Sequence, residues 1–268
     1  MAYRILGDVH THTISSRHAY STIQENVRAA AEAGLEVLGS TDHLSCMLFP
    51  EQHLRNFQHF LNTVIWPRTW DGVTLLRGCE ADIVGLDGSL FGQDIVCTHS
   101  ITGHALRRES TLFDRVVESC DYVIASVHNP EIADGASMGE ITDMYVAALE
   151  HPRVFILGHT GRSGLPYDLD TVIACAKEHH KLIEINEHSL QSSGAHHQRC
   201  REIAEKCAEL GVGITVSSDA HIAPQIGMFD AATRMLEEIH FPEELIMNRG
   251  REPFLCELAA SGVCAELH

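Results

Sequence analysis

The sequence predicts an α/β protein built as a distorted (β/α)7 TIM-like barrel, in which seven parallel strands alternate with helices. Three observations support this prediction. Short β-type apolar runs alternate with amphipathic stretches along the whole 268-residue chain. Such alternation, with strands apolar throughout, is typical of a buried parallel sheet. An open doubly wound sheet is the alternative, but the glycine-rich phosphate loop G-x-G-x-x-G that usually follows its first strand is absent.

The predicted strands are apolar runs of four to seven residues. In chain order they are Tyr3–Val9, Glu36–Ser40, Thr74–Cys79, Tyr122–Val127, Val154–Leu157, Lys181–Ile185 and Gly213–Val216. These runs are far shorter than the roughly 20 apolar residues that a membrane helix needs. We therefore expect no membrane partner.

The predicted helices fill the intervals between these runs. Thr22-x-x-Glu25 is a capping box that begins a helix, and Gly34 is a typical stop signal. Ser137-x-x-Glu140 begins another helix in the same way. Further helices are expected over 53–64, 110–119, 169–179, 197–210, 229–239 and 252–260.

Composition excludes a disordered, collagen-like or low-complexity chain. With 44% hydrophobic and 21% charged residues, residues 1–268 are expected to form a single domain with a large core. The net charge of −18 disfavours long nucleic acids and anionic lipids as partners. The nine cysteines include no C-x-x-C pair, and the N-terminus does not resemble a signal peptide. These features predict free thiols and a cytoplasmic location.

Histidine is unusually abundant, with 19 residues against 19 lysines and arginines together. Imidazole is the commonest metal ligand in proteins. Six of the seven apolar runs are followed by a group that can bind a metal or move a proton. These candidates are His10, His12 and His18, then His43, Glu80, His128 and His159, and finally Asp219 and His221.

The predicted barrel brings these scattered residues together, because the carboxyl ends of parallel strands meet on one face. Two-residue periodicity puts His10 and His12 on the same side of their strand, and Asp219 and His221 repeat that spacing. The candidate set contains imidazole and carboxylate but no thiolate, which suits zinc, manganese or iron. Closely spaced metals of this kind typically serve phosphoester hydrolysis.

These motifs resemble the PHP (polymerase and histidinol phosphatase) superfamily. The resemblance rests on D8-V-H10-T-H12, T41-D42-H43, Glu80, His128, G158-H159 and S218-D219-A-H221. It covers nearly the whole chain and is closest to the YcdX-type phosphatases, which implies a site for three divalent metal ions, with zinc favoured over manganese or iron. By this resemblance, His10, His12, Glu80 and Asp219 hold the first metal. Glu80, His128 and His159 hold the second, and His18, His43 and His221 hold the third.

The resemblance implies a metal-dependent phosphatase whose metal-bound hydroxide attacks a small anionic phosphate monoester. A phosphodiesterase or nucleotide-trimming exonuclease is the main alternative. Amidohydrolase chemistry and a non-catalytic metal-binding module are further alternatives. The sequence leaves a homo-oligomer open.

Two features depart from the family pattern. Residues 93–110 form an apparent insertion with His99, His104, Arg107 and Arg108, which is expected to act as a lid, a substrate selector or an oligomer contact. An arginine also follows His159 at position 162. Arg162 and Arg17 are candidate phosphate contacts, because guanidinium matches phosphate geometry.

Two carboxylates next to the candidate ligands have a different predicted role. Asp8 and Asp42 precede ligand candidates and are expected to orient imidazole N–H groups.

Overall fold

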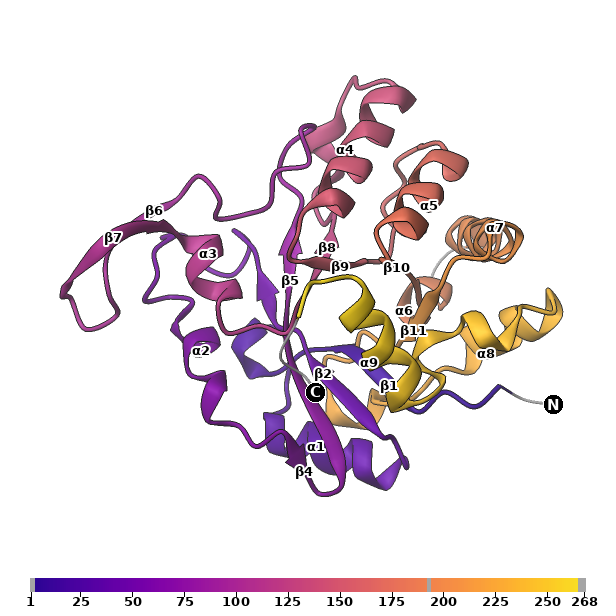
Figure 1. Cartoon of the computed structure of the whole chain (residues 1–268), viewed down its shortest axis with the longest axis horizontal. Coiled ribbons are helices and arrows are strands. Elements are labelled where there is room, and N and C mark those ends of the chain that lie inside the picture. The colour runs from indigo at the N-terminus through magenta and orange to yellow at the C-terminus, as the bar shows by residue number, and fades with distance from the viewer. Residues whose placement is uncertain (1–2, 192–193, 265–268) are drawn as a thin grey trace.

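The computed structural model describes residues 3–191 and 194–264 and contains a nearly closed parallel barrel (Figure 1). Its seven strands follow chain order around the sheet. They are β1 (Gly7–Thr11), β2 (Val37–Ser40), β5 (Val73–Asp82), β8 (Tyr122–Ser126), β9 (Val154–Leu157), β10 (Leu182–Asn186) and β11 (Ile214–Ser217). The short strands β3 (His43–Leu44) and β4 (Thr69–Trp70) also pair with β5. The predicted (β/α)7 barrel is confirmed.

Helices surround this barrel (Figure 1). They are α1 (Ile23–Glu32), α2 (Gln58–Leu61), α3 (Leu112–Val117), α4 (Met138–Glu150), α5 (Leu169–Glu178), α6 (Glu187–Leu190), α7 (Gly194–Leu210), α8 (Asp230–Glu238) and α9 (Arg251–Ala260). Both predicted capping boxes form, at Thr22 with Glu25 and at Ser137 with Glu140. Within 3–191 and 194–264, no helix combines the length and apolar character that crossing a membrane requires.

The barrel closes where β1 meets β11. Near the strand ends, Thr11 and Ala220 form a parallel bridge, and the backbone N–H of Asp219 donates to the carbonyl of His10 at 3.0 Å. Lower down, the buried side chain of Asn248 spans the two strands. Its Nδ2 donates to the carbonyls of Gly7 and Val216, both at 2.6 Å, and its Oδ1 accepts from Val216 N–H at 3.0 Å. Asn248 therefore supplies part of the pairing that the strands do not make directly.

The interior of the barrel is apolar at its N-terminal end. Val9, Tyr122 and Phe155 are fully buried there against Phe254 and Leu258 of α9. The Tyr122 hydroxyl donates to the carbonyl of Val9 at 2.5 Å. Helix α9 therefore plugs this end, and polar side chains collect at the other.

Two predicted boundaries were wrong. The first strand begins at Gly7 and not at Tyr3, because its parallel partner β2 begins only at Val37, opposite Gly7. The helix expected over 53–64 is reduced to α2 and a 3-10 turn at Thr63–Ile65. Phe57 precedes α2 without a side-chain cap.

Residues 93–110 contain most of a two-stranded antiparallel sheet of β6 (Val96–His99) and β7 (Ala105–Thr111). This hairpin extends away from the barrel next to α3 (Figure 1). Arg107 and Arg108 are exposed on it. Its role as an insertion with a function of its own stays a prediction.

Candidate metal centre

The structure brings all nine predicted ligands together at the carboxyl ends of the strands. His10 lies in β1, His43 in β3 and Glu80 in β5. The other six follow strands or a turn on the same face: His12 and His18 after β1, His128 after β8, His159 after β9, and Asp219 and His221 after β11. The strand pairing places His43 directly opposite Glu80.

The first group contains His10, His12, Asp219 and one oxygen of Glu80. His12 Nε2 lies 3.1 Å from Asp219 Oδ1 and 3.5 Å from Glu80 Oε2. His10 Nε2 lies 3.3 Å from Glu80 Oε2 and 3.6 Å from Asp219 Oδ1. Ligands of a tetrahedral ion with bonds near 2.1 Å stand about 3.4 Å apart. These four atoms therefore have the spacing of a metal coordination shell.

The second group forms around the other oxygen of Glu80. Glu80 Oε1 lies 2.7 Å from His159 Nε2 and 3.4 Å from His128 Nε2. Glu80 is fully buried. Its Oε1 faces His128 and His159, whereas its Oε2 faces His10, His12 and His43, whose Nδ1 lies 2.8 Å away. A carboxylate in this position can bridge two cations.

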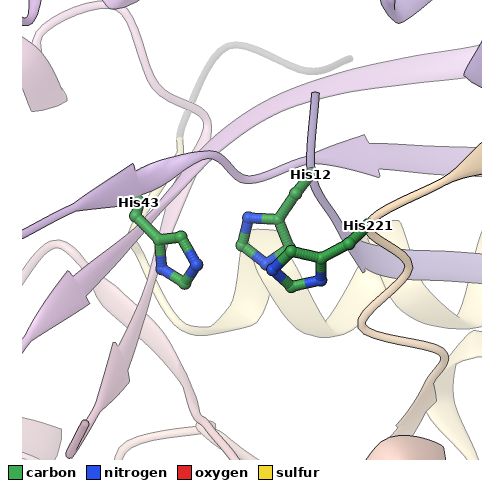
Figure 2. Close-up of side chains that lie close together, drawn as sticks. All are labelled: His12, His43 and His221. Atoms are coloured by element: carbon green, nitrogen blue, oxygen red, sulfur yellow. The ribbon is translucent and has the colours of Figure 1, made fainter. Parts of the chain in front are cut away.

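The third group is a set of stacked imidazoles. His18 Nε2 and His221 Nε2 lie 3.0 Å apart, and the ring of His43 lies 4.9 Å from that of His18. Figure 2 shows His43 facing the pair formed by His12 and His221, whose ring centroids are 4.3 Å apart. His12, His43 and His221 each offer a nitrogen within 4.8 Å of the others.

The orientation of the imidazoles fits metal ions. In four of them Nδ1 is held by a fixed partner and Nε2 faces the cluster. Those partners are Glu184 for His10, Ser16 for His12, Asp82 for His128 and the Asp219 carbonyl for His221. His10 Nε2, both nitrogens of His43 and Glu80 Oε2 are buried without a hydrogen bond to the described residues. Buried polar atoms are normally satisfied, so these atoms point to a cation.

The charges of the cluster also favour cations. Burial opposes ionisation of Glu80 and Asp219, yet the neighbouring histidines hold both carboxyl pKa values well below their usual range. Burial and the charge of His43 lower the pKa of His12 to about 3. At His128, burial lowers the pKa, but the negative charges of Glu80 and Asp82 outweigh this effect and raise the pKa to about 9. At neutral pH the carboxylates are therefore anionic and His12 is neutral, the forms that bind metals, whereas a metal ion would have to displace the proton of His128.

Comparison with known proteins places the chain in a family. The PHP domain family model matches residues 8–188. The chain belongs to the PHP family. A "probable phosphatase" of Clostridium botulinum (strain Langeland) is 40% identical over 265 residues, which cover 99% of both chains. A "probable phosphatase" of Photobacterium profundum is 35% identical, covering 97% of this chain and 96% of the relative. The predicted PHP resemblance and the prediction of an enzyme of the phosphatase class are confirmed.

A solved structure with the same fold is the histidinol phosphate phosphatase of Lactococcus lactis, crystallised with zinc, L-histidinol and phosphate. It superposes with a TM-score of 0.56 and 18% sequence identity, covering 90% of this chain and 95% of that one. The similarity supports the PHP barrel fold of this chain.

Two carboxylates of this PHP domain were missed as partners of the ligands. Glu184 accepts from His10 Nδ1 and from the backbone N–H of His159, both at 2.7 Å. Asp82 accepts from His128 Nδ1 at 2.7 Å. Two-residue periodicity places Asp82 on the same side of its strand as Glu80, but it does not identify the imidazole that Asp82 or Glu184 contacts.

The role predicted for Asp8 and Asp42 was wrong. Asp8 accepts from the backbone N–H and hydroxyl of Ser218, because the β11 end passes directly over it. Asp42 accepts from the Ser16 hydroxyl at 2.6 Å, so it reaches His12 only through that serine. Neither carboxylate touches an imidazole N–H directly, because both are occupied by these loop donors.

The two candidate arginines lie in different surroundings. Arg162 donates to Asp219 Oδ2 at 3.0 Å and lies at the edge of the cluster. Arg17 stacks over the ring of Phe49, with its guanidinium carbon 5.0 Å from the ring centroid. The structure therefore brings Arg162 to the candidate ligands and gives Arg17 an aromatic partner.

Replacing Glu184 tests whether its contacts orient the ligands. Glu184→Gln keeps the shape but turns one acceptor into a donor, which faces either His10 Nδ1–H or the His159 N–H. We expect metal affinity to fall by about 10- to 100-fold, as for other residues that orient a ligand. Competition with a chromophoric chelator measures this affinity.

The matched control is Glu244→Gln, which changes an exposed glutamate. Its metal affinity should equal that of the unmodified chain. Equal affinities in both variants would contradict the orienting role of Glu184.

Proposed function

We propose that the chain hydrolyses phosphate monoesters at a centre of three divalent metal ions, with zinc as the natural metal. The supporting observation is that His10, His12 and His128 have Nδ1 atoms held by fixed partners and Nε2 atoms that converge on Glu80 and Asp219. Zinc and phosphate in the Lactococcus lactis structure agree with this proposal.

We propose a division of the ligands among three positions, in which His43, whose Nδ1 also lies 2.8 Å from Glu80 Oε2, borders two of them. His10, His12, Glu80 and Asp219 would hold one ion; Glu80, His128 and His159 a second; and His18, His43 and His221 a third. Bound together, such ions hold phosphate oxygens, lower the pKa of a water molecule and neutralise the charge that develops during hydrolysis.

The chain itself contributes binding and orientation. Arg162 lies beside Asp219, where its guanidinium can contact a phosphate oxygen while remaining near the cluster. Arg17, whose neighbour is His18, is the second candidate for this contact. A small anionic ester suits this arrangement, because three bound divalent ions would concentrate positive charge at the mouth of an otherwise acidic chain.

Elemental analysis of the untagged chain, combined with activity assays, tests the proposal. We expect two to three tightly held equivalents of zinc, manganese or iron at the cluster. p-Nitrophenyl phosphate should be hydrolysed and bis(p-nitrophenyl) phosphate should not. Chelation should abolish activity, and added zinc should restore it.

Two outcomes would contradict the proposal. Less than about one metal equivalent that reconstitution cannot raise would exclude the three-metal centre. Hydrolysis of the diester alone would instead indicate a phosphodiesterase.

A further inference from the structure

A second group of metal-binding side chains lies outside the candidate metal centre. Glu150 is the last residue of α4, Cys175 lies in α5, and His179 follows the end of α5. The carboxylate, thiol and imidazole each offer a ligand atom within 4.8 Å of the others. Helices α4 and α5 lie side by side on the outside of the barrel (Figure 1).

This group lies at the opposite end of the barrel from the candidate metal centre. The C-terminal ends of α4 and α5 lead directly into the beginnings of β9 at Val154 and β10 at Leu182. The candidate metal centre lies where the strands end. A metal at Glu150, Cys175 and His179 would therefore be separate from it.

Local geometry explains why these groups meet. Cys175 and His179 are four residues apart, so they lie on one face of the helix one turn from each other. Glu150 reaches them from the neighbouring helix, and its exposed side chain can close the remaining distance to the about 3.5 Å expected between zinc ligands. Two helices thus contribute to one set of donors.

These three side chains have no other assigned partner. Within the described part of the chain, none of them takes part in a side-chain hydrogen bond or ion pair. The nearby Lys181 does not neutralise them by direct contact, because its Nζ donates to the carbonyl of Val154 at 2.5 Å. Burial, Glu150 and Glu178 raise the pKa of the Cys175 thiol to about 11, and a coordinating cation reverses such a shift.

We propose that Glu150, Cys175 and His179 form a separate site that binds a borderline-soft divalent metal ion, namely Zn²⁺. Sulfur, nitrogen and oxygen donors together suit zinc, and water completes a tetrahedral shell. The bound ion links the end of α4 to the end of α5.

Cobalt is the probe, because a thiolate bound to Co²⁺ gives a near-ultraviolet sulfur-to-metal charge-transfer band. The ligands of the candidate metal centre contain no sulfur, so cobalt bound there gives no such band. We expect the chelator-treated, reduced full chain to develop the band on titration with Co²⁺. Added Zn²⁺ should remove it by displacing the cobalt.

Variants separate this site from the other cysteines. Cys175→Ser should lose the band, whereas Cys256→Ser, which changes an exposed cysteine of α9, should keep it. His179→Gln, at the helix end, should weaken cobalt binding at least about tenfold, since even residues that only orient a ligand contribute that much. Absence of the band in the unmodified chain, its persistence in Cys175→Ser, or its resistance to Zn²⁺ would overturn the proposal.

Discussion

Glu80→Gln is expected to lower kcat/KM for a phosphate monoester by about 10³-fold or more and to reduce bound metal by about two equivalents. The two oxygens of Glu80 face different ligand groups, so a neutral amide weakens two metal positions at once. Metal charge contributes several kcal/mol to such transition states, and 1.4 kcal/mol corresponds to a factor of ten. Steady-state kinetics and elemental analysis of the same sample measure both effects.

The control for this prediction is Glu252→Gln in α9, at the plugged end of the barrel. It makes the same chemical change on an exposed side chain and should leave activity and metal content unchanged. Circular dichroism establishes that Glu80→Gln remains folded. A folded Glu80→Gln variant with full turnover would exclude Glu80 as a bridging ligand.

Asn248→Ala is expected to lower the free energy of unfolding by about 3–5 kcal/mol. The substitution removes three hydrogen bonds between buried groups and leaves the carbonyls of Gly7 and Val216 and one N–H without their partner. Each abandoned buried group costs about 1–3 kcal/mol, and local relaxation recovers part of that cost. Chemical denaturation of the metal-loaded chain measures the loss.

Asn248→Asp and Asn56→Ala make this test specific. Asp cannot donate to the two carbonyls, so Asn248→Asp should destabilise the barrel at least as much as Asn248→Ala. Asn56, near α2, is half-buried and donates one solvent-exposed hydrogen bond to the carbonyl of Glu51, so its replacement should change stability far less, by about 0.5 kcal/mol. A loss below about 1 kcal/mol in Asn248→Ala would show that Asn248 does not hold β1 to β11.

The barrel strands could be predicted because they are buried on both sides and therefore appear as continuous apolar runs. The run Val154–Leu157 matches β9 at both ends, and most of the others differ from their strands by one or two residues. The hairpin of β6 and β7 could not be found in this way. Most of its side chains are at least partly exposed, so its sequence has no apolar run.

The convergence of the candidate ligands could be predicted because most of them closely follow apolar runs, and topology alone gathers such positions on one face. The residues that orient these ligands could not be assigned from position alone. Asp42 precedes a ligand yet contacts Ser16, whereas Glu184 lies within a strand and contacts His10. Such contacts depend on side-chain rotamers and on loop paths, which sequence spacing does not determine.

The plug formed by Phe254 and Leu258 of α9 has a consequence for how material moves through the enzyme. Because that end of the barrel is filled, substrate and product would reach and leave the proposed centre through the opening at the strand ends. Incoming ester and departing inorganic phosphate then share one passage and the same anion-binding groups. At such a centre, inorganic phosphate would have to dissociate before the next ester could bind.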